Sequence, residues 1–434
     1  MKKIPLYHIL AIMLTCSMIC RAQWVRTNGL TGYSVSSLGV SGEAVFAGTH
    51  HGVFRTTNNG GDWTAINAGL TDTTVLSFAF APSVSGAPYC FAGTGGGVFG
   101  SMHPGDPWTP MNIGLPAGNV NALAAFPYAA GDSMEIFAGV YDFLNGGGIY
   151  RSTDNGAHWH PAMTGLTHFD VRSFTRMQSI DGPVLFAATY GGGVFRSSDS
   201  GEHWSAAGTG LTTLNIAALA SCEGVGRLFA ATNGGGIFRS ADLGLHWNAV
   251  NDGLTNVIIN ALIVCSAGVN GDSVRLAAGS GWSGIFVSSN SGTVWSLAND
   301  GLTTTQINAL MLSTDRRTLF AGTDDGVWRR PMSELLTGVL READNAPTQY
   351  RLEQNYPNPF NLSTIIRFQL PAGGMTTLSI FDAVGREAAT LVNEVKEAGT
   401  YSASFEGSDL SSGIYFARLS ANGRVQIRRL VLMK

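Results

Sequence analysis

The sequence predicts an all-β protein: a seven-bladed β-propeller closed by its N-terminal strand, followed by a small C-terminal β-sandwich. Three observations support this fold class. A unit that ends in tryptophan recurs at intervals of 39 to 51 residues, which is the length of a four-stranded propeller blade. Each unit has four short apolar segments between turn residues, and helical periodicity is absent. Glycine, at 56 of 434 residues, is about twice as frequent as usual, without a collagen period.

The N-terminus has the pattern of a signal peptide. Two lysines precede a largely apolar run over residues 6–19, and residues 20–22 offer a small-x-small cleavage site before Gln23. We therefore expect residues 1–22 to direct export and to be removed. The apolar run falls short of the ~20 residues of a membrane helix, so we expect no transmembrane anchor after cleavage.

The middle of the chain consists of repeats of one sequence unit. A typical copy is GIYRSTDNGAHW, which ends a blade's third strand and opens its fourth. One unit cannot bury both faces of its sheet, so neighbouring units must stack, and a closed ring protects most sheet edges. The copies end at Trp63, Trp108, Trp159, Trp204, Trp247 and Trp295.

The two ends of the repeat array complement each other. Residues 24–30, WVRTNGL, match fourth-strand segments such as WTAINAGL but lack three strands before them. At the other end LFAGTDDGVWRRP supplies second and third strands, and Pro331 ends the pattern without a fourth. We therefore predict seven blades over residues 23–330, with the N-terminal segment lying beside the DDGVWRR strand.

The octet Ser/Thr-x-Asp/Asn-x-Gly-x-x-Trp suits a turn. Its hydroxyl and carboxylate can accept backbone N–H bonds, its glycine permits positive φ, and its tryptophan packs on the sheet. The octet resembles the Asp-box, or bacterial neuraminidase repeat, of sialidase-type propellers. Blade two, with His103 in place of the acid, should have the least regular turn. The structural octet positions are Thr56, Asn58, Gly60, Trp63, Ser152, Asp154, Gly156, Trp159, Ser197, Asp199, Gly201, Trp204, Ser240, Asp242, Gly244, Trp247, Ser288, Asn290, Gly292 and Trp295.

Three patterns suggest a metal site, a carboxylate-binding site or a phosphate-binding loop. The positions of these residues in the repeats argue against all three. Three histidines before the octet tryptophans suggest zinc, and four arginines before the octets suggest a carboxylate clamp, but each falls on a different blade. The GGG segments lack the lysine and the helix of a phosphate loop. We therefore expect no metal and no cofactor. The histidines are His158, His203 and His246, and the arginines are Arg55, Arg151, Arg196 and Arg239.

Charge and cysteine content narrow the partners and the covalent links. Residues 24–340 contain 13 arginines, 21 acidic residues and no lysine, a net charge of −8, which would repel a phosphate backbone and argues against nucleic acid. Cys90, Cys222 and Cys265 remain after signal cleavage. Cys222 and Cys265 hold equivalent positions in successive repeats, which is compatible with a bridge, while buried single thiols are the alternative.

We expect ligand-binding residues where the sequences of the repeats differ most. These positions are the turns between second and third strands and the crossovers between blades. Rings beside carboxylates and amides suit a glycan, a peptide or a protein ligand. The short crossovers favour binding without catalysis, so no catalytic residue is assigned. The alternative is a glycan-cleaving hydrolase of sialidase or xyloglucanase type, with Asp142, Asp170, Asp324 and Asp325 as the acids to consider. The candidate ligand-binding residues are His50, His51, Tyr141, Asp142, Phe143, His168, Asp170, Tyr190, Asn233, Trp282, Asp324 and Asp325.

The C-terminal part has a different composition. Residues 331–349 lose the repeat and form a polar linker, and residues 350–434 contain about seven strand signals with turn punctuation between them. Seven strands in this length indicate a small β-sandwich. An ordinary fibronectin-like sandwich with a binding role is one interpretation.

The last 85 residues also resemble a type A sorting domain of the type IX secretion system of Bacteroidetes-like bacteria. The resemblance implies passage through the periplasm, translocation by the type IX machinery, and a secreted or outer cell-surface location. Leu362 stands where a proline is commoner. The matching positions are Asn355, Tyr356, Pro357, Asn358, Pro359, Phe360, Gly385, Arg386, Gly413, Tyr415 and Lys434.

Overall fold

The computed structural model describes residues 23–81, 89–127, 134–142, 146–267, 274–335, 349–355, 357–396 and 399–434. The chain divides into two compact units, residues 1–336 and 337–434. The expected signal peptide, most of the expected linker, Phe143 and Tyr356 lie outside the described residues. Among the described helices, none is long and apolar enough to span a membrane.

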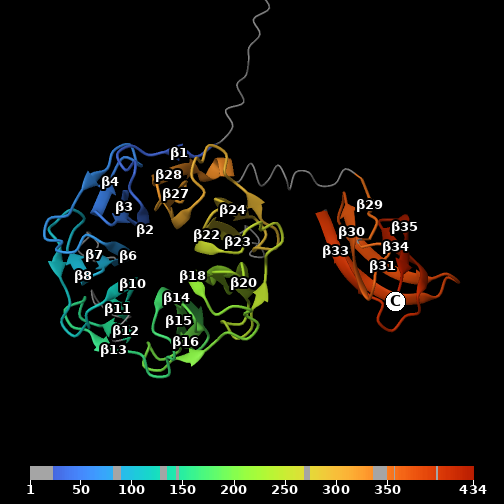
Figure 1. Cartoon of the computed structure of the whole chain (residues 1–434), viewed down its shortest axis with the longest axis horizontal. Helices are drawn as coiled ribbons and strands as arrows, with labels where there is room; N and C mark the ends of the chain where they lie inside the picture. The colour runs from blue at the N-terminus through green and yellow to red at the C-terminus, as the bar shows by residue number, and fades with distance from the viewer. Residues whose placement is uncertain are drawn as a thin grey trace, which may run out of the picture. The chain divides into compact units, whose positions relative to one another are not determined.

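Repeated four-stranded antiparallel sheets, arranged around a ring, build the first unit (Figure 1). The described residues contain seven of them within this unit. Six follow chain order: β2 (Val35–Ser41), β3 (Ala44–Thr49), β4 (Gly52–Thr56), β5 (Thr64–Ala65); β6 (Val75–Ala81), β7 (Tyr89–Thr94), β8 (Gly97–Ser101), β9 (Thr109–Pro110); β10 (Asn119–Pro127), β11 (Met134–Asp142), β12 (Gly146–Ser152), β13 (His160–Pro161); β14 (Val171–Ser179), β15 (Gly182–Thr189), β16 (Gly193–Ser197), β17 (Ser205–Ala206); β18 (Ile216–Cys222), β19 (Arg227–Thr232), β20 (Ile237–Ser240), β21 (Asn248–Ala249); and β22 (Ile259–Ala267), β23 (Val274–Ser280), β24 (Ile285–Ser288), β25 (Ser296–Leu297).

The remaining sheet joins the two ends of the array. It consists of β26 (Ile307–Leu312), β27 (Thr318–Thr323), β28 (Gly326–Pro331) and the N-terminal β1 (Val25–Arg26). In β1, Val25 pairs with Arg329 and Arg26 with Trp328. The opening segment therefore lies beside the DDGVWRR strand, as the ends of the repeats predict.

The core lies between neighbouring sheets. A phenylalanine at the same position of most second strands is at most 1% exposed, and Ala277 takes its place in β23. The cluster around Phe229 and Trp295, for example, combines residues of β18–β21 with residues of β22–β25. Because each such side chain contributes about 1.5–3 kcal/mol when buried, every sheet depends on its neighbours. The phenylalanines are Phe46, Phe91, Phe137, Phe186, Phe229 and Phe320.

The octet turns have the hydrogen bonds that their sequence predicts. The Gly156 N–H donates to the Ser152 hydroxyl at 2.9 Å, and the His158 N–H donates to the Asp154 carboxylate at 2.9 Å. Gly156 has φ of 86°. Asn58 and Asn290 accept the corresponding backbone N–H bond through their amide oxygens. In the second sheet Ser101 donates instead to the His103 carbonyl at 2.7 Å, so this turn does differ from the others.

Each octet tryptophan also fastens its sheet to the preceding one. The Trp204 indole donates to the Ala162 carbonyl at 2.8 Å, and the Trp204 N–H donates to the Thr164 carbonyl at 2.8 Å. Trp24 makes the same pair of contacts: its indole donates to the Ala298 carbonyl at 2.7 Å, and its backbone N–H donates to the Asp300 carbonyl at 2.7 Å. The N-terminal segment thus completes both its own sheet and the contact with the preceding sheet.

The histidines and arginines near the octets have separate local roles. His158, His203 and His246 each lie 2.7–2.8 Å from the aspartate of their own turn, through Nδ1. Arg151 donates to Glu202 of the following sheet at 2.9 Å, and Arg239 donates to the Ser291 carbonyl of the following sheet at 3.1 Å. These arginines therefore connect neighbouring sheets and do not converge.

The two cysteines at equivalent repeat positions, Cys222 and Cys265, are not linked to each other. Cys222 and Cys265 are both buried and unbridged, so the bridge that their equivalent positions permit is not made. Burial raises the pKa of the Cys265 thiol to about 12, although Arg316 and Arg275 oppose the shift.

The second unit is a sandwich of two antiparallel sheets. One contains β29 (Arg351–Leu352), β30 (Ser363–Leu370) and β33 (Gly399–Glu406). The other has the order β32 (Glu387–Lys396), β31 (Gly374–Asp382), β34 (Gly413–Ala421) and β35 (Arg424–Leu432). Phe368 and Phe405 of the first sheet share a buried core with Leu378 and Leu430 of the second.

Replacement of Trp24 tests the ring closure. Trp24→Ala removes a side chain that is 2% exposed and its bond to Ala298, and truncation of a buried aromatic costs about 3–5 kcal/mol. We expect the calorimetric transition of the first unit to shift to lower temperature. Val25→Ala, in the same strand but 48% exposed, is the matched control. Equal effects of the two replacements would contradict the closure argument.

The octet aspartates predict acid sensitivity. Burial opposes the charged form, but hydrogen bonds from the histidine backbone, the histidine ring and the serine hydroxyl outweigh it and lower the pKa of Asp154, Asp199 and Asp242 to about 2 each. Because the native pKa lies below the unfolded value, their stabilisation is complete above about pH 4 and is lost as pH falls toward 2.

The triple variant Asp154→Asn, Asp199→Asn, Asp242→Asn should therefore lose less of its melting temperature between pH 5 and pH 2.5 than the natural protein. Asparagine already occupies this position at 58 and 290, so the turns should persist. Asp181→Asn, outside the octets, is the control. An unchanged pH dependence in the triple variant would refute the assignment.

Candidate functional site

The ring has two faces with different loops. Because the strands are antiparallel, the turns between second and third strands lie on the same face as the crossovers, which we call the crossover face. The octet turns and the turns between first and second strands lie on the opposite face, which we call the octet face. The described candidate ligand-binding residues lie in the loops, or at the strand ends, of the crossover face.

Several of these residues hold the loops themselves together. Asp325 forms an ion pair with Arg26 and accepts the Gly32 N–H at 2.8 Å, so it fastens the closing strand. Asp324 accepts a hydrogen bond from the Thr304 hydroxyl. The His51 ring lies edge-on to Tyr33, with centroids 5.0 Å apart. These contacts favour a structural role for Asp324, Asp325 and His51.

Two further candidates are placed by main-chain contacts. The Asn233 N–H donates to the Asn215 carbonyl at 2.9 Å, and the His50 carbonyl accepts a bond from the Thr73 hydroxyl at 3.1 Å. Tyr141 and Asp142 end β11, opposite Gly147 and Gly146 of β12.

One group of candidates does converge. Asp170, in the crossover before β14, accepts bonds from the Asn121 amide at 3.0 Å and the Arg172 guanidinium at 2.6 Å. Arg172 also lies over the Tyr190 ring, 5.6 Å from its centroid. The backbone N–H of Tyr190 donates to the Asp170 carbonyl at 2.9 Å. His168 belongs to the same crossover and lies against Gly192, so closely that a Cβ added to this glycine would stand 2.6 Å from the histidine Cβ.

This group borders a polar cavity of about 270 Å³ on the ring axis. The first strands of all the ring sheets contribute to its lining, and each has a register shift near its start. Such bulges redirect a side chain. Among the residues at these bulges, Asn260 and Asn308 donate to the next sheet's Ile307 and Val35 carbonyls, while Arg172 turns to Asp170. The cavity therefore combines amides, hydroxyls and one guanidinium with apolar side chains, Leu76 and Ala217 taking the equivalent position in two sheets.

Two exposed aromatic side chains lie on the same face, in turns of two separate sheets. Trp282, between β23 and β24, is 66% exposed, and Tyr190, between β15 and β16, is 45% exposed. Exposed rings of this size provide apolar faces on which a sugar or a side chain can stack. They are separated along the ring, so they suit an extended ligand better than a small one.

Sequence reasoning missed Arg172, Asn121 and Asn260, because they lie in strands and not in loops. The available signal was one position near the start of each first strand, which is polar in several repeats although the strand pattern is otherwise apolar. Only the shared bulge explains why this position points toward the axis.

The sorting positions lie largely within the fold of the second unit. Asn355 is buried and donates to the Pro357 carbonyl and the Thr364 hydroxyl at 3.0 Å each. Phe360 is 1% exposed, and the Asn358 side chain accepts the Val431 N–H at 2.9 Å. These residues join the NYPNPF segment to the last strand.

The turn residues of this unit have equally local contacts. Gly385 has φ of 86°, and Arg386 donates to Asp382 at 2.8 Å. Tyr415, two residues into β34 after Gly413, donates its hydroxyl to the Ser411 carbonyl at 2.9 Å. The Lys434 N–H donates to the Ser412 hydroxyl at 2.9 Å, which holds the chain end.

Together, repeated four-stranded sheets around a ring define the first unit as a β-propeller-like fold. Residues 354–433 match the family model of the secretion system C-terminal sorting domain, and the second unit is such a domain. The protein is therefore exported by the type IX secretion system to a secreted or cell-surface location. Among curated proteins, no sequence has significant similarity to the chain.

Solved structures similar to this chain include several propellers. YCF48 bound to D1 peptide has a TM-score of 0.52 at 16% identity, covering 72% of this chain and 96% of its own. PorZ, a surface component of the type IX system of Porphyromonas gingivalis, has a TM-score of 0.50 at 15% identity. This match covers 92% of this chain and 59% of the PorZ chain. The GH74 xyloglucanase of Xanthomonas campestris has a TM-score of 0.54 at 14% identity. This match covers 80% of this chain and 59% of the xyloglucanase chain. This chain thus spans 59% of the latter two, and the likenesses establish the fold alone.

Proposed function

We propose that the protein is a binding module of the cell surface or its surroundings: a seven-bladed propeller of the Asp-box type over residues 23–330, carried out of the cell by the sorting domain at residues 350–434. A signal peptide at residues 1–22 and a linker at residues 331–349 complete this proposal. The ligand is a glycan, a peptide or a protein segment that lies across the crossover face.

The observation that supports this proposal most is that the polar cavity and two exposed aromatic rings lie on the same face, the crossover face. Arg172, Asp170 and Asn121 present fixed donors and acceptors, and Tyr190 and Trp282 present apolar faces. A few placed polar groups among rings is the usual composition of a ligand site. A peptide-bound propeller and a surface propeller among the similar structures are consistent with binding.

A glycan-cleaving activity has less support. The xyloglucanase shares the fold, but a fold alone does not carry its chemistry. Of the four acids proposed for it, Asp170, Asp324 and Asp325 each have hydrogen-bond partners within their own loops or in neighbouring segments. A general acid needs an oxygen that can reach the glycosidic bond.

Binding to a glycan array and a peptide array, beside hydrolysis of a fluorogenic sugar panel, tests the proposal. For a ligand found with the full secreted chain, we expect Tyr190→Ala or Trp282→Ala to weaken binding about tenfold, since truncation of an aromatic anchor in an interface costs more than about 1 kcal/mol. Arg172→Gln should weaken it as well.

The control is Ile180→Ala. Ile180 is fully exposed and lies in the same sheet as Tyr190, but at the octet face. Binding that survives both aromatic replacements would remove the proposed face. Sugar hydrolysis that Asp324→Asn abolishes would replace the binding module by an enzyme.

A further inference from the structure

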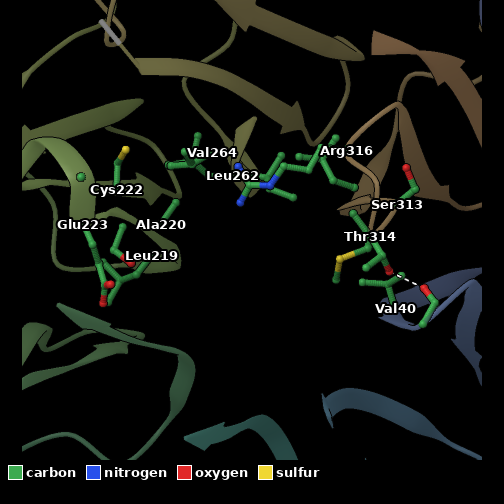
Figure 2. Close-up of a pocket in the computed structure, with 16 residues that line it drawn as sticks. Val40, Leu219, Ala220, Cys222, Glu223, Leu262, Val264, Ser313, Thr314 and Arg316 are labelled. Atoms are coloured by element: carbon green, nitrogen blue, oxygen red, sulfur yellow. Dashed lines mark hydrogen bonds between the residues drawn. The ribbon is translucent and has the colours of Figure 1, made fainter. Parts of the chain in front are cut away.

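A second hollow, larger than the polar cavity, lies at the other end of the ring axis, on the octet face. It has a volume of about 810 Å³ and is lined by the ends of β18, β22 and β26 with part of β2. Its floor is aliphatic, with Leu219, Leu262, Val264 and Met311 as main contributors. Figure 2 shows these residues around a common space, which we call the octet-face depression. Its volume falls within the usual range of ligand sites, roughly 300–1,000 Å³.

A guanidinium group extends into this depression. Arg316 lies in the turn between β26 and β27, and its side chain reaches from there toward Leu262 and Val264 (Figure 2). The Arg316 guanidinium donates to the Cys265 carbonyl, with 3.5 Å between Nη1 and the oxygen. No carboxylate among the described residues forms an ion pair with Arg316. The guanidinium therefore retains unused donors above an apolar floor.

The turn holds Arg316 in an unfavourable backbone conformation. Its φ is 56°, in the left-handed region where glycine or asparagine is favoured over arginine. The Ser313 hydroxyl donates to Asp315 at 2.6 Å and accepts the Thr318 N–H at 2.9 Å, while the Thr314 hydroxyl donates to the Gly42 carbonyl across the ring closure. The turn is thus fixed on both sides, and the side chain is directed inward.

A charge of opposite sign borders the same depression. Glu223 begins a short 3-10 segment, Glu223–Val225, directly after β18 and lies on the β18 side of the space (Figure 2). The depression therefore has a cation at one side, a carboxylate at another and aliphatic side chains between them. A ligand that matches it needs an anionic group, an apolar middle and a cationic group.

We propose that the octet-face depression binds the free C-terminal end of a short aliphatic peptide. Arg316 takes the terminal carboxylate through paired N–H donors, the aliphatic floor takes the last side chains, and Glu223 takes an ammonium group further along the peptide. A fatty acid shares the carboxylate and the apolar chain, but it would place hydrocarbon against Glu223. This site lies on the face opposite Tyr190 and Trp282 and does not rest on the function proposed above.

Calorimetric titration of the full chain with free-terminus tetrapeptides of alanine, leucine and valine tests this site. We expect the C-terminally amidated form of the peptide that binds most tightly to bind at least tenfold more weakly, because amidation removes the charge-assisted contact with Arg316. A tenfold loss of affinity corresponds to about 1.4 kcal/mol. Arg316→Asn should cause a similar loss. Asparagine tolerates the left-handed backbone, so the turn should keep its fold, which an unchanged melting temperature verifies.

Arg317→Gln is the matched control, because Arg317 is the next residue, is 86% exposed and does not line the depression. It should leave the affinity unchanged. A loss of peptide affinity in Tyr190→Ala or Trp282→Ala would instead place the peptide on the crossover face and contradict this proposal. Glu223→Gln should weaken the free-amine peptide and leave its N-acetylated form unchanged. The proposal fails if no peptide of the panel binds, if amidation or Arg316→Asn has no effect, or if decanoate binds more tightly than the peptides.

Discussion

The structure depends on one pairing, that of β1 with β28. Without it, β28 would be an unpaired edge strand, and unpaired edges invite association with other chains. Trp24 strengthens the pairing because it also bonds to Ala298 of the preceding sheet, and Asp325 strengthens it through Arg26 and Gly32. Both ends of the axis are lined in part by β2 and β26, the first strands of the two sheets that meet at the closure. Asp325 is therefore part of the frame that makes a site possible.

The repeated residues form this frame, and the residues that differ between repeats are free to take other roles. Octet tryptophans bond to the preceding sheet and octet aspartates close their own turns, so both residues serve the stability of the ring. Arg151 and Arg239 follow the same rule, since they reach the octet turn of the next sheet. Binding chemistry must then come from positions that no repeat rule fixes, such as Arg172, Tyr190 and Arg316.

The sequence allowed the frame to be predicted because the frame is periodic. The partner strand of residues 24–30, the octet turns and the sorting domain all follow from matching segments. The candidate site was predicted less well, because its contacts join residues that no period relates. Asp325 was assigned to a ligand, yet its partner Arg26 lies 299 residues away in sequence. Arg172 was overlooked because its direction depends on a bulge, and Arg316 because its surroundings come from three other strands.

The ring axis is where binding capacity can arise in such a frame. Side chains from the first strands of all the ring sheets meet there, so one residue from each can be combined into a surface that no single repeat contains. At the crossover face the combination includes amides, hydroxyls and one guanidinium among apolar side chains. At the octet face it is an aliphatic floor bordered by one guanidinium, one carboxylate and several hydroxyls. First strands line both ends of the ring axis, and the bulge that they share lies only near the crossover face. The side chains at the two ends can therefore differ in charge and polarity while the sheets between them keep the same geometry.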